Sequence, residues 1–169
     1  WHTDGSLQQV EIECLDLEAP HVAYGATVGE EEAVWASGGD RIVSLLPDEE
    51  GNLKAASWIP DVVTSDLAVD GEGTLWVVIA GDLWTRLEGG AWSWWRFEQD
   101  VDGIEPGPGG SLWISTGGGL WVHLDGAFGP TEQPHEGSLL GVDEDGRALL
   151  AHPGGLARVT VGDEPLPPP

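Results

Sequence analysis

A hydrophobic signature recurs four times along this chain, and its spacing limits the folds that the chain can adopt. Each copy begins with an apolar pair and places an aliphatic residue eight positions after the first member of the pair. Successive copies lie 41, 37 and 36 residues apart, a period that is typical of solenoids and propellers. The pairs are Val34-Trp35, Leu75-Trp76, Leu112-Trp113 and Ala148-Leu149, and the later residues are Ile42, Leu83, Leu120 and Leu156.

Within each copy the sequence predicts short antiparallel strands. Apolar residues alternate with period two over short runs, and Gly, Pro, Asp or Asn interrupts them every few positions. The second copy reads as strands over 65–69, 74–79, 83–87 and 91–97, joined by glycine-containing turns. The expected fold is therefore all-β, with about four sheets of four antiparallel strands each.

The length of 169 residues favours one domain. We expect it to cover residues 1–163, with sheets at about 21–60, 61–99, 100–134 and 135–163, and to be followed by a Pro-rich tail or linker at 164–169. The fourth copy lacks an outer strand, whereas 6–16 alternates like a strand that belongs to no copy. We predict that 6–16 pairs with Leu156–Val161, so that the N-terminal strand completes the last sheet and closes a ring.

Charge and cysteine content exclude several functions. Thirty acidic and six basic residues give a formal net charge of -24, which repels nucleic acid and anionic membrane surfaces. Cys14 is the only cysteine, so neither an internal disulfide nor a multi-cysteine zinc site is expected. No apolar run is long enough for a spanning helix, and we expect no direct membrane insertion and no cofactor.

One stretch of the third copy resembles a known repeat. Gly107–Thr116, continued by Gly119-Leu120-Trp121, is similar to the repeat of two-component-regulator propellers and of streptogramin-lyase-type propellers. The stretches 70–76 and 143–149 match it more loosely, and the resemblance covers about 24–161. It implies four-stranded blades arranged radially around an axis. Such families usually have more than four blades, so association into a larger ring is an alternative.

In propellers of this type, ligands commonly bind near the axis on loops between strands two and three and between blades. The residues that these loops offer within blades are Asp40, Arg41, Asp82, Thr116 and His152, and those between blades are His21, Asp100, Asp102, Glu132 and His135. Converging carboxylates and imidazoles could hold a divalent cation. Ordinary solvated loop residues are the alternative, and we expect no metal site.

Tryptophan supplies ten of the thirteen aromatic residues. Trp35, Trp76 and Trp113 share one strand position and are expected to pack between sheets. Trp94 and Trp95 are adjacent on an outer strand and cannot face the same side. We expect at least one of them to be exposed, either as a sugar-stacking or partner-binding platform or packed against a neighbouring sheet's edge.

The sequence carries no recognisable catalytic set. The five histidines are expected in loops or at termini, and no nucleophile elbow or metal-hydrolase motif occurs. The favoured function is a non-catalytic binding or sensing module for a small molecule, glycan or protein, at the cell surface or outside the cell. The alternatives are a lyase or hydrolase with His and carboxylates at the axial mouth, and a half-propeller assembly unit that forms a homodimer.

Overall fold

The computed structural model describes residues 21–28, 31–38, 40–86, 91–131 and 137–160. These residues form fifteen β-strands, one short 3-10 turn at Pro108–Gly110 and no α-helix. The described chain contains no helix with the length and apolar character needed to cross a bilayer. The prediction of an all-β fold built from four antiparallel sheets is confirmed.

The sheets follow one another in sequence, and each is a meander whose neighbouring strands are consecutive. The first sheet contains β1 (His21–Val28), β2 (Glu31–Gly38), β3 (Arg41–Pro47) and β4 (Leu53–Pro60). The second contains β5 (Thr64–Val69), β6 (Leu75–Ile79), β7 (Asp82–Arg86) and β8 (Trp92–Trp95). The third contains β9 (Val101–Pro106), β10 (Leu112–Thr116), β11 (Gly119–Leu124) and β12 (Ala127–Pro130). The fourth contains β13 (Ser138–Val142), β14 (Ala148–His152) and β15 (Gly155–Val159).

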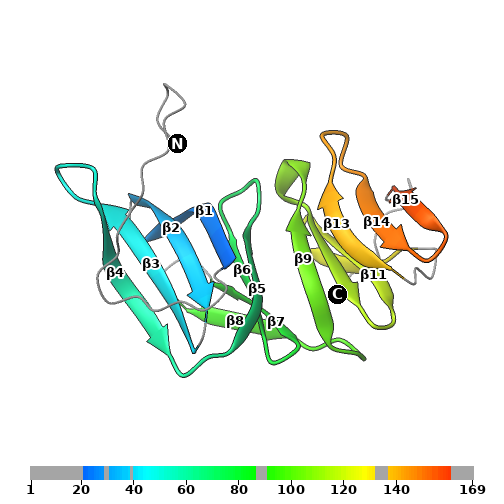
Figure 1. Ribbon diagram of the computed structural model, residues 1–169, viewed down its shortest axis with the longest axis horizontal. Coiled ribbons are helices and arrows are strands. Elements are labelled where there is room, and N and C mark those ends of the chain that lie inside the picture. The colour runs from blue at the N-terminus through cyan, green and yellow to red at the C-terminus, as the bar shows by residue number, and fades with distance from the viewer. Residues whose placement is uncertain (1–20, 29–30, 39, 87–90, 132–136, 161–169) are drawn as a thin grey trace.

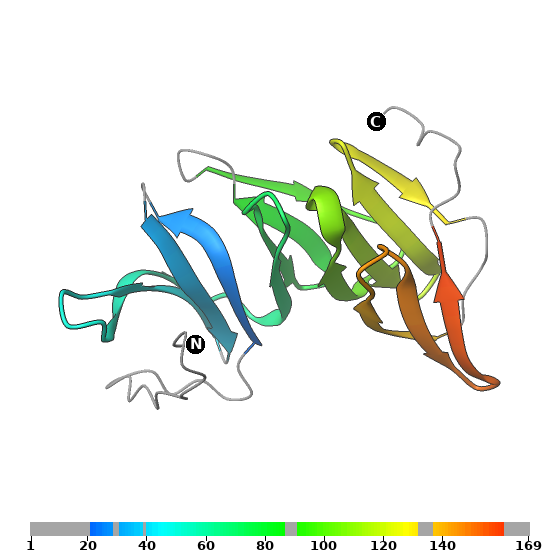
Figure 2. The ribbon, with the colours of Figure 1, turned by 90° about the horizontal axis from the view of Figure 1, so that it is seen from above.

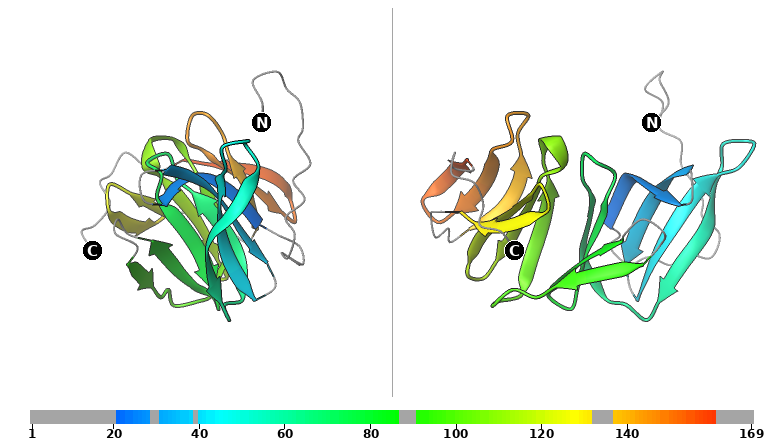
Figure 3. Two further views of the ribbon diagram at one scale, coloured as in Figure 1. Left: turned by 90° about the vertical axis from the view of Figure 1, so that its left-hand side faces the viewer. Right: turned by 180° about the vertical axis from the view of Figure 1, so that it is seen from behind.

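The four sheets stand in a row, with the first and fourth at opposite ends of the molecule (Figures 1 and 2). Their innermost strands, β1, β5, β9 and β13, contact one another in that order, and the view from behind shows the same succession (Figure 3). The fourth sheet has three described strands, and β15 pairs with β14 alone among them. The strand at 6–16 that we expected beside β15 lies outside the described residues.

One interface recurs between successive sheets. Trp35, Trp76 and Trp113 are at most 2% exposed, and each faces the second strand of the following sheet. Trp76, with Val78 and Leu83, packs against Leu112 and Ile114. The first and second sheets meet through Trp35, Ile42, Leu75 and Val77, and the third and fourth through Trp113, Leu120, Ala148 and Leu150. The tryptophans are the inter-sheet wedges that the sequence predicts.

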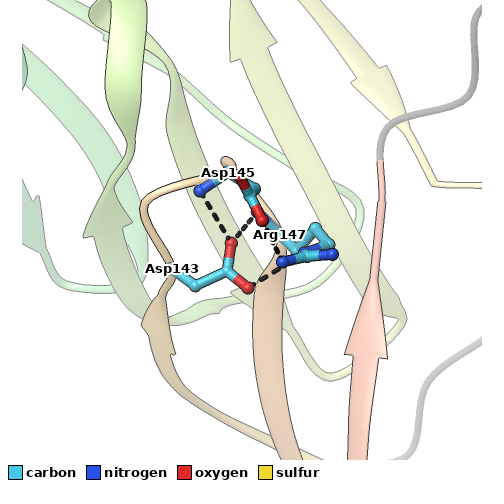
Figure 4. A network of polar contacts seen from close by, with 3 residues as sticks. All are labelled: Asp143, Asp145 and Arg147. Carbon is cyan, nitrogen blue, oxygen red and sulfur yellow. Dashed lines mark hydrogen bonds and ion pairs between the residues drawn. The ribbon is translucent and has the colours of Figure 1, made fainter.

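Aspartates fix three of the hairpin turns. Asp70 Oδ1 accepts backbone N–H groups from residues two and four positions later, at 2.9 Å each, and Asp48 and Asp143 do the same. The Asp143 turn also holds Arg147, whose Nε donates to Asp143 Oδ2 at 2.9 Å and whose Nη2 contacts Asp145 (Figure 4). A carboxylate that bonds the backbone two residues on favours a tight turn.

The Asp70 turn touches the turn of the third sheet at 107–111 through glycines. An ideal Cβ placed on Gly71 would lie 3.2 Å from the Gly110 backbone nitrogen, and one on Gly110 would lie 2.7 Å from the side chain of Glu72. Gly110 also has a φ of 74°, which glycine adopts at little cost. The turns of the second and third sheets therefore approach closely because neither glycine carries a side chain.

Candidate functional site

Polar contacts connect the innermost strands of the first three sheets. Asp66 on β5 lies 3.2 Å from His21 Nδ1 on β1, and its Oδ2 accepts the Ile104 N–H of β9 at 2.8 Å. Asp66 Oδ1 also accepts the Leu67 N–H. One carboxylate thus links three successive sheets.

Glu105 is half-buried near this carboxylate. Burial raises the pKa of Glu105, and the negative charge of Asp66 raises it further. In the described part of the chain, no group of three or more His, Cys, Asp or Glu side chains is placed to hold a metal ion. The inner strands therefore provide a hydrogen-bonded link between sheets, with one carboxyl that resists ionisation.

A second constellation lies on the outer half of the second sheet, where β7 and β8 pair. The Trp84 and Trp94 rings stack with centroids 6.0 Å apart and planes inclined by 25°, because the two residues are cross-strand partners. The Arg96 guanidinium carbon lies 5.2 Å from the Trp94 ring centroid. Trp94 is 49% exposed, so about half of this indole faces solvent.

Asp82 fixes the arginine of this constellation. Arg96 Nε donates to Asp82 Oδ1 at 2.8 Å and Nη2 donates to Oδ2 at 2.5 Å, which is the paired geometry that a guanidinium and a carboxylate favour. The hydrogen bond from Arg96 holds the pKa of Asp82 below its usual range. Among the described residues Nη1 makes no hydrogen bond, so it can still donate. We call Asp82, Trp84, Trp94 and Arg96 the indole platform.

Trp95 points to the opposite face of β8, as the sequence predicts. Its ring contacts Trp76 and Phe128, with centroids 5.6 and 5.2 Å away, and it packs against the core between the second and third sheets. Trp94 and Trp95 therefore differ in role: the first is half-exposed and the second closes an inter-sheet core.

His123 belongs to this aromatic core and corrects the expectation that the histidines occupy loops or termini. It lies within β11, and His21 lies in β1. The His123 ring centroid is 4.8 Å from that of Trp76 and 4.6 Å from that of Phe128. Burial lowers its pKa, against the opposing effect of Asp70, Glu72 and Asp125. Its Nδ1 is buried and has no partner among the described residues.

The structure places the remaining predicted site residues apart. Arg41 Nε donates to the neighbouring Asp40 at 2.9 Å in an exposed pair. The Thr116 hydroxyl donates to the Gly119 carbonyl within its own hairpin. His152 is exposed and its Nδ1 accepts the Gly154 N–H. His135 lies outside the described residues. Of the predicted set, Asp82 and Trp94 are the two that a common partner, Arg96, brings together.

Sequence reasoning missed Trp84 and Arg96. A signal for Trp84 was present, because it stands two residues after Asp82 in a run of alternating character and so shares its face of the strand. Arg96 is one of only six basic residues, but its partner depends on the register between β7 and β8, which the spacing alone does not give.

No family model matches the sequence. No curated protein matches it either. Solved structures do match the fold: streptogramin B lyase superposes with a TM-score of 0.61 at 19% identity, covering 87% of this chain and 53% of that chain. Each sheet of the present structure is a propeller blade. The expected resemblance to propellers is confirmed at the level of the fold.

Two further structures agree. Virginiamycin B lyase from Staphylococcus aureus matches with a TM-score of 0.59 at 19% identity, covering 83% of this chain and 52% of that chain. The extracellular domain of a hybrid two-component system from B. thetaiotaomicron matches with a TM-score of 0.59 at 18% identity, covering 87% of this chain and 22% of that chain. The chain spans about half the length of the lyases that it matches, and identities this low establish the fold alone.

Proposed function

We propose that this chain is a non-catalytic binding module that recognises a neutral, hydroxyl-rich ligand, a glycan, on the indole platform. The observation that carries the proposal is the half-exposed Trp94, stacked on Trp84 and covered in part by an arginine that Asp82 fixes. A sugar has an apolar C–H face that packs on an indole and hydroxyl groups that need hydrogen-bonding partners. Trp94 packs against the apolar face of the sugar, and Arg96 Nη1 donates a hydrogen bond to a hydroxyl group.

The charges of the platform favour a neutral ligand. Arg96 is already neutralised by Asp82, so the site offers no uncompensated cation to an anionic ligand, and the net charge of -24 repels anions from the whole molecule. A cationic ligand would have to displace the guanidinium that already lies over Trp94. A neutral ligand meets no charge repulsion, and it can pack on the part of Trp94 that is exposed to solvent.

Preorganisation supports binding as the function. The cross-strand Trp84 and the two hydrogen bonds to Asp82 hold Trp94 and Arg96 before any ligand arrives, which reduces the ordering cost of binding. One fold neighbour is an extracellular domain of a sensor system and others are lyases. A location outside the cell or at its surface is part of this proposal, because glycans are abundant there.

The experiment is isothermal titration calorimetry with a panel of neutral oligosaccharides against the wild-type chain and the Trp94→Ala variant. We expect at least one oligosaccharide to bind the wild-type chain and to bind Trp94→Ala at least about tenfold more weakly, a difference of about 1.4 kcal/mol. Leu156→Ala is the matched control, because Leu156 is also an exposed apolar residue but lies on the fourth sheet. Equal binding by the wild-type chain and Trp94→Ala contradicts the platform.

An enzyme is the second candidate, and the contact between His21 and Asp66 is the observation that favours it. A histidine paired with a carboxylate can act as a general base. Asp66 is, however, already engaged by two backbone N–H groups, which is the pattern of a structural carboxylate. Turnover of any ligand found in the panel, lost in His21→Gln, would support the enzyme.

A further inference from the structure

The loop at 97–100 leads from the second sheet to the third and begins directly after the arginine of the indole platform. Both of its ends are anchored. At the first end, the Phe97 ring meets Trp121 of the third sheet edge-on, with ring centroids 5.3 Å apart. At the second end, the Val101 N–H donates to the Gly81 carbonyl at 2.9 Å. The side chains between these anchors therefore project from a fixed backbone.

Two glycine turns make room for the polar side chains of this loop. An ideal Cβ placed on Gly81, in the turn of the second sheet, would lie 2.7 Å from Asp100 Cγ and Oδ1. One placed on Gly117, in the turn of the third sheet, would lie 2.5 Å from Gln99 Oε1. A side chain at either glycine would push the neighbouring polar group away, so the turns place both groups.

Gln99 and Asp100 keep their hydrogen-bonding capacity for a ligand. Both side chains are exposed, and neither makes a hydrogen bond among the described residues. Asp82 differs, because both of its carboxylate oxygens accept from Arg96. A free carboxylate accepts through two oxygens, and an amide both donates and accepts. We call Gln99 and Asp100 the loop pair.

The loop pair lies beside the indole platform. The Asp100 carboxylate packs on Gly81, the residue before Asp82, which in turn holds Arg96. The hydrogen bond to Asp82 raises the pKa of Arg96 most, and the negative charge of Asp100 raises it further. The platform's donor and the loop's acceptor thus lie close together, next to the exposed part of Trp94.

This arrangement matches the chemistry of a sugar chain. A sugar unit stacked on Trp94 leaves the next unit of the chain beside the platform, where its hydroxyl groups need partners. The two oxygens of Asp100 can accept from two adjacent hydroxyl groups, and hydrogen bonds to an ionised acceptor are stronger than those to a neutral one. The Gln99 amide adds a donor and an acceptor. An anionic sugar unit would be repelled by Asp100.

We propose that the loop pair is a second subsite, which binds the sugar unit next to the one stacked on Trp94 and makes the module selective for chains of at least two neutral units. Asp100 accepts hydrogen bonds from the hydroxyl groups of the second unit, and Gln99 completes the contact. A monosaccharide on Trp94 does not reach the loop pair, so chain length determines affinity. This inference rests on the proposed function, because the platform holds the first unit.

The test is an NMR titration with the mono-, di- and trisaccharide of the series that binds best in the calorimetric panel. We expect the wild-type chain to bind the disaccharide at least about tenfold more tightly than the monosaccharide, since the second unit adds charge-assisted hydrogen bonds. Asp100→Ala should lose most of this gain and bind the monosaccharide like the wild type. Asp102→Ala is the matched control, because Asp102 is also exposed and carries the same charge two residues later.

Gly117→Ala probes the subsite without changing either member of the loop pair. Its Cβ would occupy the place of Gln99 Oε1, and only the end of a flexible side chain has to move, so the variant should fold. We expect it to bind the disaccharide about threefold more weakly, the effect of one lost hydrogen bond, and the monosaccharide unchanged. A loss of affinity for both sugars would contradict the assignment of Gln99 to the second unit.

The outcomes separate this inference from the proposed function. Trp94→Ala should weaken binding of every chain length, whereas Asp100→Ala should weaken only the longer ones. A wild-type chain that gains nothing from the second unit overturns the second subsite and leaves the platform standing. Asp100→Ala with the full gain, or Asp102→Ala with the same loss as Asp100→Ala, also overturns it. Binding of no oligosaccharide by the wild-type chain overturns both proposals.

Discussion

The Trp76 indole nitrogen donates a 2.8 Å hydrogen bond to Asp70 Oδ2, and this bond joins a turn to an inter-sheet core. Asp70 is 7% exposed and Trp76 is 2% exposed. The other carboxylate oxygen of Asp70 caps the turn by accepting the Glu72 and Thr74 N–H groups. The same side chain thus shapes the hairpin between β5 and β6 and orients the tryptophan that separates the second and third sheets.

Replacing Asp70 should therefore lower the free energy of unfolding more than replacing an aspartate that only caps a turn. Asp70→Ala leaves three N–H donors without their acceptor, and we expect a loss of about 2 to 3 kcal/mol in the free energy of unfolding. Asp48→Ala is the comparison, because Asp48 caps its turn in the same way but its other oxygen pairs with the exposed Lys54 instead of a buried indole. Urea denaturation should show a clearly smaller loss for Asp48→Ala. Equal losses would contradict the prediction that the buried indole bond adds to the stability given by the turn.

The third sheet lacks this bond. Gly107 stands where Asp70 stands in the second sheet, and the Trp113 indole nitrogen is buried without a partner among the described residues. Trp76→Phe should thus destabilise the chain by about 1 to 2 kcal/mol more than Trp113→Phe, because the first change removes a buried hydrogen bond and the second does not. Chemical denaturation of both variants provides the comparison, and a larger loss in Trp113→Phe would contradict it.

We expect His123 to make the free energy of unfolding fall as the pH becomes more acidic. Burial lowers its folded-state pKa below the ordinary value of 6.5, so the unfolded chain takes up the proton first. Its contribution to stability is complete above about pH 6.5 and is lost as the pH falls toward the folded-state pKa. His123→Gln should lower the dependence of unfolding free energy on pH between 7 and 5. The control is His152→Gln, because His152 is exposed.

Glu105 should make the free energy of unfolding depend on pH in the direction opposite to His123. Burial, and then Asp66, raise its folded-state pKa above 4.5, so the ionised form is disfavoured in the folded chain. Glu105→Gln should stabilise the protein at pH 7, by less than about 1 kcal/mol because water still screens this half-buried group. The gain should shrink as the pH falls through the folded-state pKa of Glu105. Thermal unfolding at pH 7 and pH 4.5 would measure the gain in stability. The control is Glu98→Gln, because Glu98 is exposed. A Glu105→Gln variant with no gain in stability at pH 7 would contradict the prediction.

The sequence predicts the sheets well because their determinants are local. Alternation around Leu75 and Leu112, with glycine or aspartate at the turns, places the strands and the buried tryptophans without knowledge of distant contacts. The opposite orientations of Trp94 and Trp95 follow from the pleat alone.

The site depends on contacts that local patterns do not specify. Arg96 reaches Asp82 across fourteen residues because β7 and β8 pair in one particular register. His123 looks like any polar residue in an alternating run, yet it faces Trp76, which lies on another sheet. Arg86 holds the corresponding place in the second sheet and lies 5.3 Å from the Trp35 ring. The spacing alone gives this equivalence, because each residue lies eleven positions after the first member of its apolar pair, but the aromatic ring that each one contacts is seen only in the structure.

The measurement that tests the account most directly is the ratio of dissociation constants for the strongest-binding neutral oligosaccharide, between Trp94→Ala and the wild-type chain. Titration at low and high salt should give a ratio of about ten or more at both, because stacking of a neutral sugar on an indole does not depend on ionic strength. A ratio near one, or binding that disappears with added salt, would contradict the indole platform as the ligand site.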